Sequence, residues 1–275
     1  MRDAIPQSGP RVGTSTRSAE LTELGRRLYE AERSRTPIPQ VSAGRPWLGQ
    51  DEAYEVQQEI VRRRVQAGER IVGWKIGLTS QAMQRQLGVD QPDYAPILSG
   101  FNVPDGGSIP VGELIAPRIE AEIGFILRSP LRGPGVTGRD VAAATEGVVA
   151  ALEIIDSRIE GWKLTLVDTI SDLASSARVV SSRRKVPLDG LDLLTLGVVL
   201  RRDGEEVGSG VGSAVLGDPL EAMAWAANRL GQLGVTLEPG QLVIPGALHA
   251  SVPATSGSSF TATFDRLGDV SVRFT

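Results

Sequence analysis

Apolar residues near the start of the chain recur every three to four positions, which is the spacing of one helix face. This pattern predicts helices over residues 19–33 and 50–67, the second with Asp51 as its N-cap. Residues 36–49 between them are rich in Pro, Gly and Ser, which is typical of a loop. Residues 1–18 are polar and predict a flexible tail. The apolar positions of the first helix are Leu21, Leu24, Leu28 and Ala31.

A different pattern begins at residue 70, where short apolar runs favour strands. Residues 70–77 predict one strand, and residues 80–87 predict a short helix that ends at Gly88. From Ile109 onward strand patterns dominate, and the end of the chain alternates short apolar runs with Pro and Gly, as in a β-sandwich or roll. We therefore expect the later part of the chain to be built mainly of sheet.

Two local signals predict a hairpin and a helix within this later part. Residues 196–207 predict a hairpin that turns at Asp203-Gly204, a dipeptide favoured in two-residue turns. Pro219 suits the first position of a helix that continues over residues 220–233, and Gly234 is suited to end it.

The segment 117–127 places two carboxylates, Glu120 and Glu122, two residues apart in a predicted strand. Alternate residues of a strand project from the same face, so both carboxylates would point into one cavity. A third carboxylate, Glu153, lies within the apolar run 148–156, where an unpaired ionised group is strongly unfavourable. Three such groups in a chain without cysteine favour a hard divalent ion with oxygen ligands, magnesium or manganese.

The same glutamates have a simpler interpretation, in which each faces solvent or pairs with an arginine. Arg118 and Arg158 lie near enough in sequence to serve as such partners. The presence of a third carboxylate in a buried segment favours the metal site over this alternative.

Composition narrows the classes of function. The chain has 275 residues, 41% of them apolar, which suits a packed core in one large domain or in a small domain and a larger one. Its 29 basic and 33 acidic residues are interspersed with a net charge of -4, so it lacks the polybasic surface that nucleic acid or an anionic membrane requires. The absence of cysteine excludes disulfides and thiolate catalysis, and it is compatible with the cytoplasm. A small molecule is the expected partner.

Five segments of the chain carry a family likeness when they are taken together and in order. They are Gly73–Ser80 (GWKIGLTS), Gln86–Tyr94 (QLGVDQPDY), Pro117–Ile123 (PRIEAEI), Leu152–Arg158 (LEIIDSR) and Ser209–Leu220 (SGVGSAVLGDPL). They resemble the 2-keto-4-pentenoate hydratase and 4-oxalocrotonate decarboxylase family, within the fumarylacetoacetate hydrolase-like superfamily. The similarity runs from about residue 20 to residue 275.

The resemblance implies an α+β fold, a bent mixed β-roll with flanking helices. It implies a helical part over residues 19–69 and a catalytic roll over residues 70–275. It also implies that Glu120, Glu122 and Glu153 hold Mg²⁺ or Mn²⁺. Substrates of the family are 2-hydroxydienoates or their 2-oxo tautomers, whose carboxylate and C2 oxygen chelate the ion, and the ion stabilises the enolate that forms in either reaction.

The resemblance also implies roles for single residues. Lys75 matches the lysine of the glycine-flanked motif and would hold the substrate carboxylate or move a proton; alternatively it is a lysine at a strand edge that reaches solvent. Asp93 is implied to be an active-site acid, although an aspartate after proline also suits a turn. Asp172 is implied to be a further catalytic residue. The implied substrate contacts are Lys75, Leu173, Ser175 and His249.

Three positions depart from the family pattern. Leu173 stands where relatives carry asparagine, which removes an amide that donates and accepts hydrogen bonds. Ala95 stands where relatives carry glycine. His249 occupies a position that hydratases usually give to glycine; a lone histidine is most often structural, but its place in a loop that lines the pocket of relatives makes it a candidate for specificity or proton transfer.

Different residues support the two reactions of the family. The features that resemble hydratases are Asp93 after Gln91-Pro92, Trp162 and residues 167–169. The features that resemble decarboxylases are residues 130–135, 155–158 and 193–199. We predict hydration of 2-hydroxypenta-2,4-dienoate to 4-hydroxy-2-oxopentanoate, with decarboxylation of 4-oxalocrotonate as the alternative.

A non-catalytic member of the family, or one turned to a different 2-oxo acid in a biosynthetic pathway, is a further alternative. The departures at Leu173 and His249 leave it open, whereas the presence of Lys75 and all three metal carboxylates argues against an inert protein. Because hydratases and decarboxylases of the family associate with each other and form oligomers, the resemblance also implies a homo-oligomer and a hydratase–decarboxylase complex.

Overall fold

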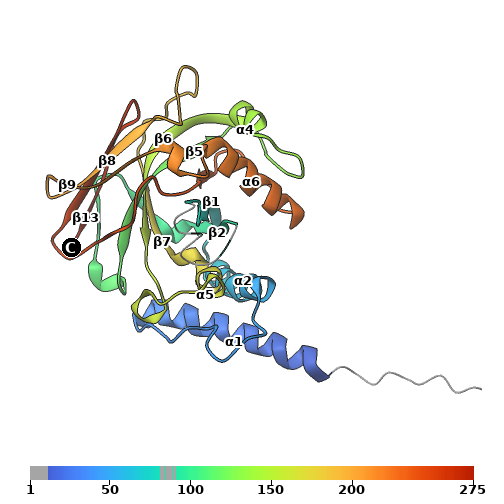
Figure 1. Cartoon of the computed structure of the whole chain (residues 1–275). Helices are drawn as coiled ribbons and strands as arrows, with labels where there is room; N and C mark the ends of the chain where they lie inside the picture. Colours follow the sequence, from blue (N-terminus) through green and yellow to red (C-terminus); the bar gives the residue numbers. More distant parts are fainter. Residues whose placement is uncertain (1–11, 81–83, 85–88, 90) are drawn as a thin grey trace, which may run out of the picture.

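The computed structural model describes residues 12–80, 84, 89 and 91–275 (Figure 1). The predicted helix over residues 80–87 lies mostly outside the described residues, as does the part of the predicted tail before residue 12. Within the described residues, α1 spans Val12–Ser34 and α2 spans Gln50–Gln66. Both predicted helices are confirmed, and α1 includes residues 12–18 that we expected in the tail.

The start of α2 differs from the prediction, because its N-cap is Gly49 and not Asp51. The Gly49 N–H donates a hydrogen bond of 3.1 Å to the Glu52 carboxylate, which reaches back from the first turn. Asp51 lies inside that turn, where a negative charge is favourable near the positive end of the helix dipole. A side chain at the cap is therefore not required here.

Two sheets form the main body of the protein. The larger sheet has eight strands in the order β2-β1-β10-β5-β6-β7-β3, with β11 paired to β5. Its strands are β1 (Ile71–Gly77), β2 (Asp93–Leu98), β3 (Asn102–Pro104), β5 (Arg118–Leu127), β6 (Thr145–Ile155), β7 (Ser176–Ser181), β10 (Leu242–Ile244) and β11 (Val252–Pro253). The smaller sheet has five strands in the order β4-β13-β12-β8-β9. Its strands are β4 (Gly107–Ile109), β8 (Gly197–Arg202), β9 (Glu205–Val211), β12 (Ser259–Phe264) and β13 (Gly268–Phe274).

Short helices flank these sheets. Figure 1 shows both sheets strongly curled, with α1, α2 and α5 (Leu166–Ser171) gathered below β1 and β2. The hairpin predicted at Asp203-Gly204 is confirmed by β8 and β9, and the helix predicted after Pro219 is confirmed by α6. The remaining α-helices have the bounds α4 (Gly138–Ala144), α5 (Leu166–Ser171) and α6 (Pro219–Gln232). This α+β arrangement of curled sheets confirms the predicted fold class.

The two N-terminal helices share an apolar core with the roll. Leu24 and Leu28 of α1 and Ile60 of α2 belong to one buried cluster with Ile97 of β2 and Val179 of β7. The two helices therefore pack on the roll. The boundary between a helical part and a catalytic roll at residues 69 and 70 stays a prediction. Among the described residues, no helix has both the length and the apolar character needed to cross a membrane.

One buried amide ties α2 to the strand and helix beside the site. Gln57 is 3% exposed, and its Nε2 donates to the carbonyl oxygens of Tyr94 on β2 at 3.0 Å and Ile170 on α5 at 2.9 Å. A buried amide that is satisfied in this way fixes the relative position of three elements.

Candidate active site

Three glutamates converge on neighbouring strands of the larger sheet. Glu120 and Glu122 lie on the same face of β5, and the register of β5 with β6 places Glu153 directly opposite Glu120. One carboxylate oxygen from each residue lies within 4.8 Å of the other two. Glu122 and Glu153 are buried, whereas Glu120 is partly exposed. These three residues are called the glutamate cluster from here on, and the shared face of Glu120 and Glu122 is the one that the alternation along the sequence predicts.

The electrostatics of the glutamate cluster favour a bound cation. Burial, with the charge of Glu153, raises the pKa of Glu120 to about 7. Burial and the charges of Glu153 and Glu120 also raise the pKa of Glu122 well above its ordinary value. Neither carboxylate oxygen of Glu153 has a hydrogen-bond partner within the described part of the chain. Three carboxylates this close together, one of them without a hydrogen-bond partner among the described residues, fit a hard divalent ion such as Mg²⁺ or Mn²⁺.

The backbone also reaches the glutamate cluster. The Gly246 N–H donates a hydrogen bond of 2.7 Å to Glu122 Oε2 from the segment that follows β10. This bond fixes one oxygen of Glu122, and no described residue donates a hydrogen bond to the other. Sequence analysis did not identify Gly246, because its role depends on its backbone N–H and not on a side chain.

Lys75 lies on β1 and is buried, with an exposed fraction of 4%. Its Nζ donates a hydrogen bond of 2.9 Å to the Ala174 carbonyl oxygen and lies 3.3 Å from Glu153 Oε2. Burial lowers the pKa of Lys75, but Glu153, Asp93 and the other glutamates together raise it above its ordinary value. The lysine is therefore a buried ammonium group beside the glutamate cluster and not a lysine that reaches solvent.

Asp93 lies at the start of β2, where its backbone pairs with Gly77 of β1. Its Oδ2 accepts a hydrogen bond of 3.3 Å from Thr169 Oγ1, and its Oδ1 has no hydrogen-bond partner among the described residues. Burial raises the pKa of Asp93, although the charge of Lys75 opposes this rise. A Cβ at Gly77 would lie 2.1 Å from Asp93 Oδ1, so only glycine lets this carboxyl group approach β1. Thr169 is a contact that sequence analysis did not single out.

Asp172 occupies a different environment from the other predicted catalytic residues. Its Oδ1 lies 2.5 Å from Arg158 Nε, and its Oδ2 accepts hydrogen bonds from Arg158 N–H at 3.0 Å and Ser157 Oγ at 3.1 Å. Burial raises the pKa of Asp172 to about 6, and the Arg158 guanidinium limits this rise. The carboxylate is therefore ionised above neutral pH and its oxygens are occupied by protein donors.

The residues after Asp172 form a left-handed turn. Leu173, Ala174 and Ser175 have φ angles of 54°, 48° and 58°, which residues other than glycine rarely adopt in succession. Leu173 is fully buried in the apolar cluster that contains α1 and α2. The turn directs the Ala174 carbonyl oxygen to Lys75, and it leaves Ser175 Oγ buried without a partner among the described residues.

His249 bonds to the edge of β5 next to the glutamate cluster. Its Nε2 accepts a hydrogen bond of 3.2 Å from the Ala121 N–H, and its Nδ1 lies 2.8 Å from the Ala250 carbonyl oxygen. The proton of the neutral ring therefore lies on Nδ1. Burial lowers the pKa of His249, which favours this neutral form.

The segment that carries His249 lies directly over β9. A Cβ at Gly210 of β9 would lie 1.8 Å from the Leu248 carbonyl oxygen, so only glycine permits this contact. The Leu248 N–H in turn donates a hydrogen bond of 3.0 Å to the Ala121 carbonyl oxygen of β5. The glycine thus lets the segment pack between the smaller sheet and the strand that carries two of the three glutamates.

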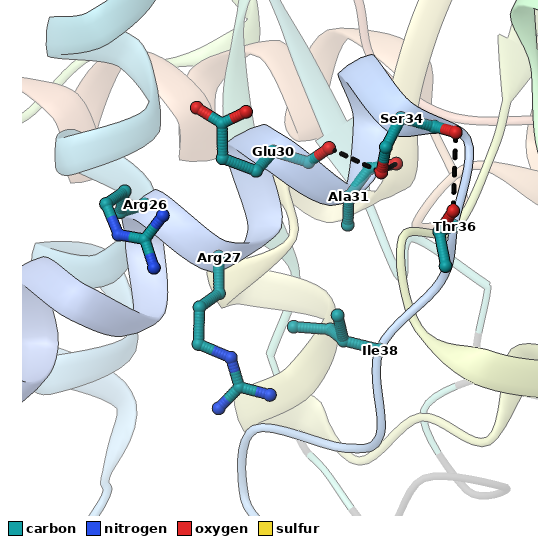
Figure 2. Close-up of a pocket in the computed structure, with 7 residues that line it drawn as sticks. All are labelled: Arg26, Arg27, Glu30, Ala31, Ser34, Thr36 and Ile38. Atoms are coloured by element: carbon teal, nitrogen blue, oxygen red, sulfur yellow. Dashed lines mark hydrogen bonds between the residues drawn. The ribbon is translucent and has the colours of Figure 1, made fainter.

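A separate pocket of about 250 Å³ is formed by α1 and the residues that follow it, and it is shown in Figure 2. It is lined by Arg26, Arg27, Glu30, Ala31, Ser34, Thr36 and Ile38. It contains no residue of the glutamate cluster and no buried ionisable group, so we assign it no role.

Comparison with known proteins places this site in a family, although no family model matches the chain. The chain is 41% identical to a 4-oxalocrotonate decarboxylase from Pseudomonas sp. (strain CF600), over 95% of this chain and 98% of that protein. It is 40% identical to a 2-keto-4-pentenoate hydratase from Paraburkholderia xenovorans (strain LB400), over 92% of this chain and 94% of that protein. The chain belongs to the 2-keto-4-pentenoate hydratase and 4-oxalocrotonate decarboxylase family.

A solved member of this hydratase and decarboxylase family also shares the whole fold. The 4-oxalocrotonate decarboxylase from Pseudomonas putida G7, complexed with magnesium and adipate, is 38% identical, with a TM-score of 0.90 over 98% of this chain and all of that one. The resemblance drawn from the sequence motifs is therefore confirmed, and the fold extends over nearly the full length of both proteins.

Proposed function

We propose that this family member is a divalent-metal-dependent lyase that adds water to 2-hydroxypenta-2,4-dienoate and forms 4-hydroxy-2-oxopentanoate. The observation that carries the proposal is the buried glutamate cluster, whose Glu153 oxygens have no hydrogen-bond partner among the described residues and face the ammonium group of Lys75. Hydratases of this family are among the relatives at about 40% identity. The proposed substrate is an anion, which suits a site with a cation and a buried lysine.

Glu120, Glu122 and Glu153 would hold Mg²⁺, or Mn²⁺ with the same oxygen ligands. When bound, this ion supplies Lewis-acid stabilisation of the negative charge that develops on the substrate oxygen at C2. Magnesium is the ion bound to the decarboxylase relative from Pseudomonas putida G7.

Lys75 and Asp93 have different roles, substrate binding for Lys75 and proton transfer for Asp93. The Lys75 ammonium group, fixed by the Ala174 carbonyl oxygen, holds and orients the substrate carboxylate. Burial raises the pKa of Asp93, and its Oδ1 has no hydrogen-bond partner among the described residues, so it is suited to exchange a proton with the substrate. Ser175 Oγ is a further substrate donor with no other partner among the described residues.

Asp172, Leu173 and His249 support these groups instead of reacting. The oxygens of Asp172 accept hydrogen bonds from Arg158 and Ser157, and Asp172 thereby holds the turn that presents the Ala174 carbonyl oxygen to Lys75. Leu173 packs its side chain into the apolar cluster beneath the turn. We propose that all three are positioning residues, which differs from the catalytic role and the direct substrate contacts expected from the motifs.

Decarboxylation of 4-oxalocrotonate is the second candidate, since a decarboxylase is among the relatives at 41% identity. The glutamate cluster suits both reactions, because loss of carbon dioxide also leaves an electron pair that a bound cation stabilises. The two candidates differ in substrate length and in the product, so one assay separates them.

The decisive experiment offers purified protein and Mg²⁺ freshly made 2-hydroxypenta-2,4-dienoate and 2-hydroxymuconate, each with and without a chelator. A chelator-sensitive gain of one water on the five-carbon dienoate, read by mass and ultraviolet absorbance, supports the hydratase. Chelator-sensitive release of carbon dioxide from the six-carbon diacid supports the decarboxylase instead. Turnover of neither compound would contradict both and favour a non-catalytic protein or one with another 2-oxo acid substrate.

A matched pair of variants tests the metal assignment. Glu120→Gln should abolish Mn²⁺ binding and turnover, because it removes one charged oxygen ligand. Glu113→Gln alters a half-exposed glutamate that pairs with Arg178, and it should leave both unchanged. If Glu120→Gln changed neither Mn²⁺ affinity nor turnover, the metal-lyase proposal would be wrong.

We propose in addition that the protein forms a homo-oligomer and associates with a partner enzyme of the same family, as the resemblance implies. Five large apolar side chains are exposed on the described surface: Val65, Ile71, Leu194, Val211 and Leu233. Light scattering coupled to size exclusion tests the homo-oligomer, and a single-subunit mass would contradict it. A location in the cytoplasm stays a prediction.

A further inference from the structure

The hydrogen bond between Thr169 and Asp93 joins two elements that are far apart in the sequence. Asp93 begins β2, whereas Thr169 lies in α5, and the bond from Thr169 Oγ1 to Asp93 Oδ2 is 3.3 Å long. With six residues, α5 is too short to be a stable helix by itself. The position of Thr169 relative to Asp93 therefore depends on the contacts that hold α5 against β2.

Gln57 of α2 makes such contacts on both sides of this bond. Its Nε2 donates to the carbonyl oxygen of Tyr94, the residue after Asp93, at 3.0 Å. It also donates to the carbonyl oxygen of Ile170, the residue after Thr169, at 2.9 Å. An amide NH₂ group has two hydrogens, and both are used here. The side chain of Gln57 thus closes a ring of three hydrogen bonds with the backbones of β2 and α5.

Both carbonyl groups lie where secondary structure supplies few donors. β2 is the first strand in the order of the larger sheet, so no other described strand pairs with its outer side. Ile170 lies in the last turn of α5, where carbonyl oxygens have no donor within the helix. Gln57 therefore supplies one hydrogen bond to each element from a third one, and an apolar residue at its position would supply neither.

Other contacts hold α2 itself against β2. Val56, the neighbour of Gln57, belongs to the same buried apolar cluster as Ile97 of β2. Tyr54, three residues before Gln57, stacks on the ring of Tyr94 with 4.4 Å between the ring centroids and 14° between the ring planes. Because α2 is fixed to β2 in this way, the amide group of Gln57 has a defined position from which to hold α5.

The other end of α5 is also held by the N-terminal part of the chain. Asp168 in its first turn is fully buried and accepts hydrogen bonds from the Ser42 N–H at 3.0 Å and from Ser42 Oγ at 2.8 Å. Ser42 belongs to the loop between α1 and α2. The loop thus holds the beginning of α5, Gln57 holds its end, and Thr169 lies between them.

We propose that Gln57 is a positioning residue for proton transfer, because its amide group holds β2 and α5 together so that Thr169 orients the carboxyl group of Asp93. The inference rests on the proposed function, in which Asp93 exchanges a proton with the substrate. Thr169 binds Asp93 Oδ2, and Oδ1, which has no hydrogen-bond partner among the described residues, is the oxygen that meets the substrate. The N-terminal helices thereby take part in the reaction without contact with the substrate.

A purely structural amide predicts different kinetics. Buried amides are usually hydrogen-bonded, and such bonds stabilise a fold whether or not a reaction depends on them. A structural Gln57 would contribute to stability alone, so a variant would keep its kcat at temperatures where it is folded. A positioning Gln57 would affect kcat while KM stays nearly constant, because Lys75 and the glutamate cluster hold the substrate and small displacements of a reacting group lower the rate.

The experiment measures kcat and KM with Mg²⁺, well below the unfolding temperature, for whichever of the two dienoates wild-type protein turns over. Gln57→Met keeps an unbranched side chain of similar length but removes both donors. We expect kcat to fall by roughly tenfold or more and KM to change by less than about twofold. The affinity for Mn²⁺ should be unchanged, because the glutamate cluster is intact.

Asn228→Leu is the matched control for a loss of stability. Asn228 is also an amide that bonds twice to backbone, donating to the Val136 carbonyl oxygen at 2.8 Å and accepting from the Val136 N–H at 2.9 Å. Val136 lies in a segment that carries no residue of the candidate site. The control should lower the unfolding temperature and leave kcat unchanged. Thermal unfolding verifies that each variant is folded.

A double-mutant cycle with Thr169→Val tests whether Gln57 acts through the bond to Asp93. Thr169→Val removes the hydroxyl and keeps the shape, and it should lower kcat, whereas Thr169→Ser should retain most of it. In the Thr169→Val background, Gln57→Met should lower kcat by less than about threefold, because the bond that it positions is already absent. If Gln57→Met is not folded, Gln57→Asn carries the test, since its shorter side chain cannot reach both carbonyl oxygens.

Two outcomes would overturn the inference. A wild-type kcat in the folded Gln57 variant would show that the amide is structural only. Fully multiplicative effects in the cycle would show that Gln57 does not act through Thr169. Failure of the proposed function has a different signature, because wild-type protein would then turn over neither dienoate, and this result would remove the reaction that Gln57 is proposed to serve.

Discussion

The Arg158–Asp172 pair and the glutamate cluster are both largely buried, yet among the described residues protein donors bind both carboxylate oxygens of Asp172 and neither of Glu153. Arg158 donates to Asp172 and to three carbonyl oxygens, and Asp172 also accepts hydrogen bonds from Ser157 Oγ and the Arg158 N–H. In the glutamate cluster, three carboxylates meet one ammonium group, that of Lys75.

Repulsion among these three carboxylates therefore remains, because Lys75 compensates only part of their charge and neither oxygen of Glu153 has a hydrogen-bond partner in the described part of the chain. A buried ion pair with all its hydrogen bonds made keeps a local structure in place. A buried group of like charges without partners instead needs a ligand from outside the chain. The comparison teaches that partnering, more than burial, separates the residues that support the site from those that bind.

The largest expected effect comes from removing one charge of the glutamate cluster. Glu153→Gln should lower kcat/KM by roughly 10³-fold or more, which corresponds to about 4 kcal/mol. The metal-free variant should unfold at the same temperature as metal-free wild type or at a higher one, because repulsion among the carboxylates is reduced. Kinetics with Mg²⁺ and thermal unfolding with chelator test the two parts. A clear loss of stability in the metal-free variant would contradict the comparison.

Breaking the Arg158–Asp172 pair should have the opposite signature. Asp172→Asn leaves the buried Arg158 guanidinium without its counter-charge, and it should lower the free energy of unfolding by about 3–5 kcal/mol. Denaturant titration measures this loss. Glu146→Gln is the matched control, because it breaks the half-exposed pair with Lys185 and should cost no more than about 1 kcal/mol. Unchanged stability with lost turnover in Asp172→Asn would instead give Asp172 a direct part in the chemistry.

Two serines, one beside Asp172 and one in the candidate site, test the same comparison at the level of a single hydroxyl group. Ser157 Oγ donates to the Asp172 carboxylate, so Ser157→Ala should lower the free energy of unfolding by about 1.5–3 kcal/mol. Ser175 Oγ has no partner among the described residues, so Ser175→Ala should change stability by well under about 1 kcal/mol and should instead lower kcat/KM by roughly tenfold. Equal losses of stability in the two variants, measured by denaturant titration, would contradict this distinction.

The smallest effect concerns His249 and depends on pH. Its Nε2 accepts from the Ala121 N–H, so His249→Gln should cost about 1 kcal/mol at pH 8, where the wild-type ring is neutral. Burial lowers the pKa of the folded ring below its ordinary value of 6.5, so the unfolded chain binds the proton more readily. The stability that wild type gains over the variant should therefore be complete above pH 6.5 and decrease as the pH falls towards the folded pKa. A difference that does not change with pH would contradict the neutral hydrogen-bonded ring.

Sequence patterns predicted the parts of the site that depend on local geometry. The two-residue spacing of Glu120 and Glu122 was enough to place them on one strand face, and both N-terminal helices follow from apolar spacing. The position of Glu153 opposite Glu120 could not be predicted from spacing, because it depends on the register between β5 and β6. The grouping of Glu153 with Glu120 and Glu122 as metal ligands was expected because the motifs resemble those of the family.

The surroundings of Asp172, of the turn over residues 173–175 and of His249 could not be predicted from the sequence alone. Leu173, Ala174 and Ser175 are residue types that disfavour a left-handed conformation, so nothing local indicates the turn they form. Bonds from Arg158 and Lys75, distant in sequence, hold it. The roles of Asp172 and the bonds of His249 are likewise set by tertiary contacts, which the motifs do not encode.

The close contact at Gly210 sets a practical limit on redesign of this enzyme. Leu248 touches the bare backbone of β9, and the same short segment carries Gly246, whose N–H bonds to Glu122. A library that randomises residues 247–251 to alter substrate range should therefore keep position 210 fixed as glycine. Any side chain there would lift the whole segment, and selection for a new substrate would then be confounded by variants that have lost the ion.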